Sequence, residues 1–227
     1  MNGILIINKP IGMTSHDVVA FVRKTLNIKK VGHTGTLDPN ASGVLVLLLG
    51  TYTKYSNDIT NYEKEYFVKV KTGIKTDTLD IDGKIIEEKQ IILDKEQLTK
   101  DILYFKKTYN QEVPIYSAIK IDGKKLYEYA RENKEVILPK REVTIKEIKD
   151  INIEKKYFSF KCLVTKGTYI RSLIKDICDK NNIIGTVYEL KRTKQGNYNI
   201  EESYTLDDIK NNNFKLIQID NHSLNQV

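Results

Sequence analysis

One short stretch of this sequence concentrates residues that could perform acid chemistry. Residues 31–45 read VGHTGTLDPNASGVL and place a single carboxylate, Asp38, between a glycine- and hydroxyl-rich approach and a small-residue exit. Pro39 restricts Asp38 to extended backbone, and the flanking glycines let the chain turn tightly or approach a ligand closely. This pattern can hold one acid out of a loop toward a cleft. A surface Asp-Pro turn is the plainer interpretation.

The stretch resembles the catalytic-aspartate motif of the pseudouridine synthases, in the branch of the TruB type. Further segments resemble motifs of the same family, occur in the family's order and extend the resemblance over about residues 3–196. These segments are NKPIGMTS at 8–15, KEY at 64–66, TDTLDIDG at 76–83, PIYSAIK at 114–120, KGTYIRSL at 166–173 and LKRT at 190–193. Each segment is weak evidence alone, and their common order makes the resemblance specific.

The resemblance implies a tRNA pseudouridine synthase, which isomerises uridine at position 55 of the T-loop without a guide RNA. The bond between ribose C1′ and uracil N1 breaks, the base rotates, and C1′ bonds to C5. The reaction involves no redox change, so neither a cofactor nor a metal is expected. The target base must leave its stack, which costs on the order of a few kcal/mol.

The resemblance assigns three catalytic residues. Asp38 is expected to act as a nucleophile, on the sugar or on the base, or to stabilise a cationic sugar. Arg171 is expected to keep that carboxylate charged, because a guanidinium pairs with a carboxylate through a two-pronged fork. A phosphate contact is the alternative role of Arg171. Tyr66 is expected to stack on the uracil and to take part in proton transfer from C5.

The resemblance also implies a substrate-binding set, comprising His33, Tyr66, Tyr169, Leu190, Lys9 and Asp80. His33 is expected to fill the space that the flipped base leaves, and Leu190 to form an apolar wall of the base pocket. Tyr169 is expected to contact the substrate and to share hydrogen bonds with Asp80 and the catalytic arginine. Lys9 is expected to contact a phosphate or to order Asp80.

The charge of the chain is consistent with an RNA partner. The net charge is +7, and residues 201–227 carry −3, which leaves +10 on the first 200 residues. Lysine and arginine gain affinity for RNA by releasing counterions from phosphate. The expected partner is the T-arm stem-loop of tRNA. A lysine- and asparagine-rich composition inherited from an AT-rich genome would explain the same charge without any function.

The hydrophobic periodicity predicts an α+β fold of intermingled strands and helices. Strands are expected over residues 3–8, 44–49, 66–71 and 185–190, with two or three antiparallel strands within 143–164. Helices are expected over residues 15–26, 94–106, 124–132 and 168–179, with Ser15 capping the first. The resemblance implies the pseudouridine synthase fold, a mixed, mostly antiparallel central sheet flanked by helices, with the active-site cleft across the sheet.

The sequence is expected to divide at residue 200. Residues 1–200 form the predicted catalytic domain, and residues 201–227 form a short acidic tail. Bacterial members of the family usually continue into a small carboxy-terminal RNA-binding domain, and these last residues are too few to build its core. We therefore expect that domain to be absent or vestigial and the catalytic domain to carry RNA recognition.

The remaining features predict a cytoplasmic protein. Cys162 and Cys178 form no metal-ligand pair, and the three histidines show no ligand spacing. The apolar runs are too short for a signal peptide or a membrane span of about 20 residues. We expect a monomer that needs no protein partner.

Two other functions compete with the isomerase. The chain could be an RNA-binding or tRNA-folding module with little catalytic activity, although Asp38, Tyr66 and Arg171 are all present. It could also be a guide-RNA-dependent relative, which would require protein partners.

Overall fold

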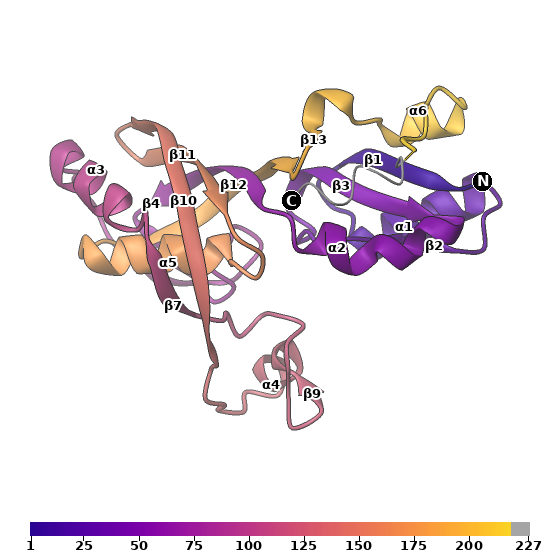
Figure 1. The fold of residues 1–227 in the computed structure, drawn as a ribbon. Coiled ribbons are helices and arrows are strands. Elements are labelled where there is room, and N and C mark those ends of the chain that lie inside the picture. The colour runs from indigo at the N-terminus through magenta and orange to yellow at the C-terminus, as the bar shows by residue number, and fades with distance from the viewer. Residues whose placement is uncertain (219–227) are drawn as a thin grey trace. The chain divides into compact units, whose positions relative to one another are not determined.

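The computed structural model describes residues 1–218, so the last residues of the predicted tail, 219–227, lie outside the described part. The chain divides into two compact units (Figure 1). The first unit comprises Met1–Tyr66 together with Leu190–Val227, and the second unit comprises Phe67–Glu189. The unit boundaries fall inside two strands, β4 (Lys64–Thr72) and β12 (Gly185–Gln195).

The first unit is built on β1 (Gly3–Lys9) and β3 (Ala41–Leu49), which pair antiparallel along their whole lengths. Both strands are runs of aliphatic residues, which is typical of strands covered on both faces. Their side chains alternate between two apolar clusters. One cluster contains Leu5, Ile7, Leu45, Leu47 and Leu49, and the other contains Ile4, Ile6, Val44, Val46 and Leu48.

Strand β12 joins β3 in parallel, with Leu190 opposite Ala41 and Arg192 opposite Gly43. Gly43 has a φ of +100°, and a Cβ at this position would lie 2.2 Å from the carbonyl oxygen of Arg192. A side chain would therefore collide with the neighbouring backbone, so the pair depends on glycine. The other elements of this unit are α1 (Ser15–Thr25), β2 (Val31–His33), η1 (Gly50–Tyr55), α2 (Ser56–Thr60), β13 (Tyr198–Asn199), η2 (Ile200–Glu202) and α6 (Leu206–Lys210).

The second unit contains sheet strands in the order β4, β11 (Tyr157–Val164), β10 (Lys140–Ile153) and β7 (Thr108–Glu112). Every second residue of β11 is buried, as the alternation in the sequence predicts. Helix α5 (Ile170–Lys180) buries its apolar face in this unit. The other elements are β5 (Ile74–Thr76), β6 (Ile85–Glu88), α3 (Lys95–Tyr104), β8 (Lys120–Ile121), β9 (Lys124–Lys125) and α4 (Leu126–Arg131).

The predicted α+β class is confirmed, since mostly antiparallel strands form a mixed sheet flanked by helices. Three helix starts were predicted wrongly. Thr14, not Ser15, caps α1, because its side chain accepts from the Asp17 N–H. The Asp122-Gly123 turn joins β8 to β9, so α4 begins only at residue 126. Helix α5 begins at residue 170 rather than 168.

Part of the predicted acidic tail belongs to the first unit and packs into its core. Ile209 on α6 is 1% exposed and lies in the cluster that contains Leu5 and Ile7. Ile217 forms an antiparallel bridge with Ile4 of β1. Within residues 1–218, no helix is both long and apolar enough to cross a membrane.

Candidate active site

Asp38 lies between β2 and β3 in residues 34–40, which we call the aspartate loop. Leu37 is 3% exposed and anchors the loop in the core, whereas Asp38 is half-buried and Pro39 is exposed. The Ala41 N–H donates to the Asp38 carbonyl oxygen over 3.0 Å and closes a turn. The carboxylate therefore sits at the boundary between core and solvent in the first unit.

Lys9, the last residue of β1, holds one side of the aspartate loop. The residue is fully buried, and its Nζ donates to the carbonyl oxygens of Pro10 (2.9 Å), Met13 (2.7 Å) and Pro39 (3.1 Å). The ammonium thus ties the segment after β1 to the residue that follows Asp38. These contacts favour a role in holding the loop over the phosphate contact predicted for Lys9.

Helix α1 and strand β12 hold the other residues of the loop. The Leu37 N–H donates to Ser15 Oγ over 2.9 Å, and that hydroxyl lies 3.2 Å from the Leu37 carbonyl oxygen. Gln195 Nε2 donates to the Thr34 hydroxyl (2.8 Å) and carbonyl oxygen (3.2 Å). Arg192 on the same strand donates from Nη2 to the Gly35 carbonyl oxygen (3.1 Å). The backbone is therefore fixed on both sides of the carboxylate.

His33 ends β2 immediately before the aspartate loop. Its Nδ1 accepts from the Gly35 N–H over 3.4 Å, and its ring meets that of His16 edge-on, with the centroids 5.2 Å apart. Burial first, and then the charges of His16 and Arg192, lower the pKa of His33 to about 4. The imidazole is therefore neutral near pH 7.

Two more predicted site residues belong to the first unit. Tyr66 lies on β4 and is 7% exposed. Leu190 lies on β12 opposite Ala41, the residue that follows the aspartate loop, and is 9% exposed. Lys9, His33, Asp38, Tyr66 and Leu190 thus belong to one compact unit.

Arg171 lies in the first turn of α5 in the second unit, with its side chain 6% exposed. Its Nη1 donates to the Thr78 carbonyl oxygen (3.0 Å) and its Nη2 to the Tyr116 carbonyl oxygen (3.1 Å). Its Nε lies 3.8 Å from Asp80 Oδ2. The fork therefore ties the acidic segment 76–83 to the segment around Tyr116.

Asp80 is held in place by its own segment. Its Oδ1 accepts from the Thr78 hydroxyl (2.6 Å) and from the Asp82 N–H (3.3 Å). Leu79 adopts a φ of +67°, and its carbonyl oxygen accepts from the Val187 N–H (3.1 Å). These bonds fix the carboxylate that faces Arg171. The predicted hydrogen bonds of Tyr169 with Asp80 and Arg171 stay a prediction.

Tyr169 caps α5 and is half-buried. Its backbone N–H donates to Gln111 Oε1 (2.8 Å), and Gln111 Nε2 donates to the Tyr109 hydroxyl (2.8 Å). That hydroxyl donates to Asp176 Oδ2 (3.0 Å), and burial raises the pKa of Tyr109, so the phenol stays protonated. The chain of bonds fixes the start of α5, where both Tyr169 and Arg171 lie.

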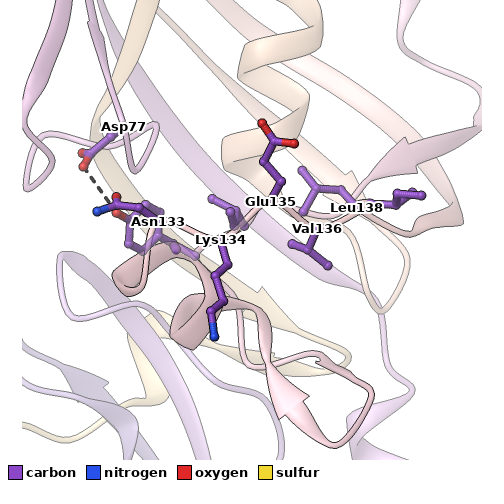
Figure 2. Close-up of a pocket in the computed structure, with 10 residues that line it drawn as sticks. Asp77, Asn133, Lys134, Glu135, Val136 and Leu138 are labelled. Atoms are coloured by element: carbon purple, nitrogen blue, oxygen red, sulfur yellow. Dashed lines mark hydrogen bonds between the residues drawn. The ribbon is translucent and has the colours of Figure 1, made fainter.

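The second unit also contains a pocket of about 720 Å³ (Figure 2). Its walls include Asp77, Tyr116 and the segment 133–138, and the Tyr116 hydroxyl donates to Asp77 Oδ2 over 3.3 Å. Tyr116 is also the residue whose carbonyl accepts from Arg171. The sequence alone gave no role to Asp77 or Tyr116, although both fall in segments with a motif resemblance.

The structure separates the predicted residues into two sets. The first unit contains the set around Asp38, and the second unit contains Asp80, Tyr169 and Arg171. The predicted pairing of Arg171 with Asp38 joins residues of different units and stays a prediction. Among residues 1–218, no group of three histidine, cysteine or acidic side chains could hold a metal ion.

Burial lowers the pKa of the Lys9 ammonium from 10.5 to about 8, with Asp38 opposing the shift and Arg192 adding to it. The unfolded chain therefore binds this proton more tightly than the folded protein over the interval between these values. We expect the free energy of unfolding of the wild type to rise relative to that of Lys9→Met as the pH increases through this window. The slope can reach about 1.4 kcal/mol per pH unit.

Urea unfolding of both proteins at about pH 7 and about pH 9.5 measures this difference, because only the wild type carries the linked proton. The expectation is contradicted if the wild type instead loses stability relative to Lys9→Met on going to the higher pH.

Comparisons with known proteins agree with the motifs. The model of the TruB family pseudouridylate synthase, N-terminal domain, matches residues 23–170. The tRNA pseudouridine synthase B of Clostridium kluyveri is 46% identical over 213 residues, which cover 94% of this chain and 74% of that protein. The protein of the same name from Caldanaerobacter subterraneus subsp. tengcongensis is 44% identical over 224 residues, covering 97% and 78%.

Solved structures resemble the fold as well. A chain in a crystal structure of a Cbf5-Nop10-Gar1 complex matches with a TM-score of 0.73 and 28% identity, covering 92% of this chain and 54% of that chain. A chain in an H/ACA RNP bound to a substrate RNA containing 2′-deoxyuridine matches with a TM-score of 0.70 and 27% identity, covering 92% and 52%. This chain therefore spans about half the length of those solved chains.

Proposed function

The chain belongs to the TruB family of pseudouridylate synthases, and we propose that it isomerises uridine to pseudouridine at position 55 in the T-loop of tRNA. Relatives named tRNA pseudouridine synthase B support the substrate, since they are 44% and 46% identical over nearly the whole chain. The observation that carries the proposal is the aspartate loop, which contacts from Lys9, Ser15 and Arg192 hold around Asp38.

In the proposed reaction Asp38 supplies the negative charge. Its carboxylate attacks C1′ of the ribose or C6 of the base, and the bond from C1′ to N1 breaks. The detached uracil rotates, C1′ bonds to C5, and the bond to Asp38 breaks, which regenerates the carboxylate. C5 then loses its proton and N1 gains one. Fixing the loop before the substrate arrives avoids reorganisation during the reaction, which is how positioning contributes to rate.

The neighbours of Asp38 in the first unit supply the surroundings of the base. His33 is uncharged near pH 7 and can occupy the space in the RNA stack that the extruded uridine leaves. Tyr66 stacks on the uracil and takes part in proton transfer at C5. Leu190 forms an apolar wall of the pocket. The low exposure of Tyr66 and Leu190 supports sheltered rather than surface roles.

The second unit contributes the cation and its supports. Arg171 keeps the catalytic carboxylate charged. Asp80 orients the guanidinium, which the distance of 3.8 Å between Arg171 Nε and Asp80 Oδ2 supports. Tyr169 contacts the substrate from the start of α5. A phosphate contact by Arg171 is less well supported, because its side chain is only 6% exposed.

Two alternatives differ in what they require. A guide-RNA-dependent enzyme is less well supported, because the identity to the Cbf5 chains is 26–28% and the identity to the tRNA enzymes is 44–46%. An RNA-binding module without turnover would not need Asp38 to be held as it is. We further propose that the protein acts in the cytoplasm as a monomer, without a protein partner, through a catalytic domain of residues 1–200.

The test uses the purified protein alone. It is incubated with an unmodified tRNA transcript, and pseudouridine is mapped along the RNA, with a transcript that carries cytidine at position 55 as the control. We expect product at that single uridine without guide RNA. Tight binding without product would identify an RNA-binding module, and product only in the presence of guide RNA and partner proteins would identify the guide-dependent enzyme.

A further inference from the structure

We propose that Arg192 is a positioning residue of the active site. Its guanidinium fixes the aspartate loop and supplies a permanent positive charge next to it. The inference rests on the proposed function of Asp38. Arg192 belongs to the LKRT segment, and the family resemblance assigns it no role.

Arg192 joins three parts of the first unit. It lies on β12, where its backbone is opposite Gly43 of β3. Its Nε donates to the Val44 carbonyl oxygen over 2.6 Å, and its Nη2 donates to the Gly35 carbonyl oxygen over 3.1 Å. One planar group therefore links the strand after the aspartate loop to the beginning of the loop, which a single ammonium could not do with the same geometry.

The aspartate loop lies next to the guanidinium, where an added Cβ would meet ordinary van der Waals contacts. A Cβ at Gly35 would lie 3.4 Å from Arg192 Nη1 and 3.5 Å from Lys64 Cε. Arg192 itself is 1% exposed, so the side chain is not available as an RNA phosphate contact in this structure. The aspartate loop therefore contacts a buried cation at Gly35.

A buried guanidinium is costly unless its charge is used or compensated. The hydrogen-bond acceptors of Arg192 described above are carbonyl oxygens. The charges of Arg192 and Asp38 both act on Lys9. Asp38 raises the pKa of Lys9, and Arg192 lowers it. Arg192 also contributes to the lowered pKa of His33. The charge therefore acts on the loop's flanking groups and on a ring that is proposed to stack in the RNA.

The experiment compares Arg192→Met, Arg192→Lys and the control Val22→Ala. Val22 is a fully buried residue of α1 in the same unit, and its truncation weakens the core without touching the aspartate loop. Each protein is measured for its melting temperature, tRNA affinity and single-turnover rate. The pKa of His33 is measured by NMR titration, with its ring signal assigned through His33→Gln.

We expect Arg192→Met to lower the single-turnover rate by about 100-fold, the scale of a misplaced catalytic group, with tRNA affinity changed by less than about threefold. The pKa of His33 rises, because one of the charges that lower it is gone. Arg192→Lys keeps that pKa low, because the charge remains, and recovers only part of the rate, because the fork is lost. Val22→Ala loses stability and keeps most of its rate.

The proposal is overturned if Arg192→Met reacts as fast as Val22→Ala at matched stability, or if the His33 pKa is the same in Arg192→Met and the wild type. Failure of the proposed function looks different, because then the wild type itself forms no pseudouridine. In that case hydrogen exchange at the Leu37 amide, which is bonded to Ser15 Oγ, still tests the anchoring. Faster exchange in Arg192→Met supports it, and unchanged exchange rejects it.

Discussion

Replacing Asp38 with asparagine is expected to abolish pseudouridine formation while leaving tRNA binding nearly intact. The amide has the same shape but no charge, so it can neither attack an electrophilic carbon nor stabilise a cationic sugar. The contacts that hold the loop at Leu37 and Pro39 go to backbone atoms, which the change leaves in place. We expect the single-turnover rate to fall by more than about 10⁴-fold, as when other catalytic nucleophiles are removed.

The measurement is a single-turnover time course with a tRNA transcript, together with an equilibrium binding curve for the same RNA. Asp58→Asn is the matched control, because Asp58 is an exposed acid of α2 in the same unit. It should react like the wild type. Residual activity of Asp38→Asn within about tenfold of the wild-type rate would exclude a nucleophilic role, since loss of a nucleophile has much larger effects.

The parts of the fold that were predicted correctly are those whose signal is local. The aliphatic run from Val44 to Leu49 and the alternation over Tyr157–Val164 identify buried and half-buried strands from periodicity alone. The hairpin of β5 and β6 was not predicted. Ile85 and Ile86 are consecutive and both exposed, so β6 has no alternation that marks one buried face.

The anchors of the aspartate loop could not be predicted from local patterns. A lysine at the end of a strand is normally solvated, and Lys9 is buried only because Pro10, Met13 and Pro39 direct three carbonyl oxygens at one point. Pro39 is 30 residues away in sequence, so this arrangement depends on the tertiary fold. The same holds for Arg192, whose partner Gly35 is 157 residues away.

The contacts of Arg171 illustrate a second limit of prediction from the sequence. The family resemblance predicted both a pairing with Asp38 and a network with Asp80. In the structure Asp80 Oδ2 lies 3.8 Å from Arg171 Nε. The guanidinium also donates to the carbonyl oxygens of Thr78 and Tyr116, which no motif specified. Backbone acceptors depend on how loops close and not on residue type, so a sequence pattern does not identify them.

These contacts of Arg171 lead to the second large prediction, that Arg171→Lys loses far more activity than affinity. The guanidinium bonds the Thr78 and Tyr116 carbonyl oxygens at once, and a lysine ammonium has no planar fork with which to bridge them. We expect the single-turnover rate to fall by about 10³-fold, the upper range for removing one fixed donor from an active site. Binding and single-turnover assays with the same tRNA transcript measure both effects.

Arg171→Lys is expected to lose more rate than affinity because the two quantities depend differently on the placement of one side chain. RNA affinity is a sum over many phosphate contacts, so one side chain that is only 6% exposed contributes little to it. Turnover depends on the placement of a few groups, and a small displacement of the segments that Arg171 joins is enough to lower it. Arg131→Lys is the matched control, because Arg131 lies in the same unit, is exposed and rests over the Tyr127 ring. If Arg171→Lys instead weakens binding as much as it slows the reaction, the arginine holds the RNA and the activating role is wrong.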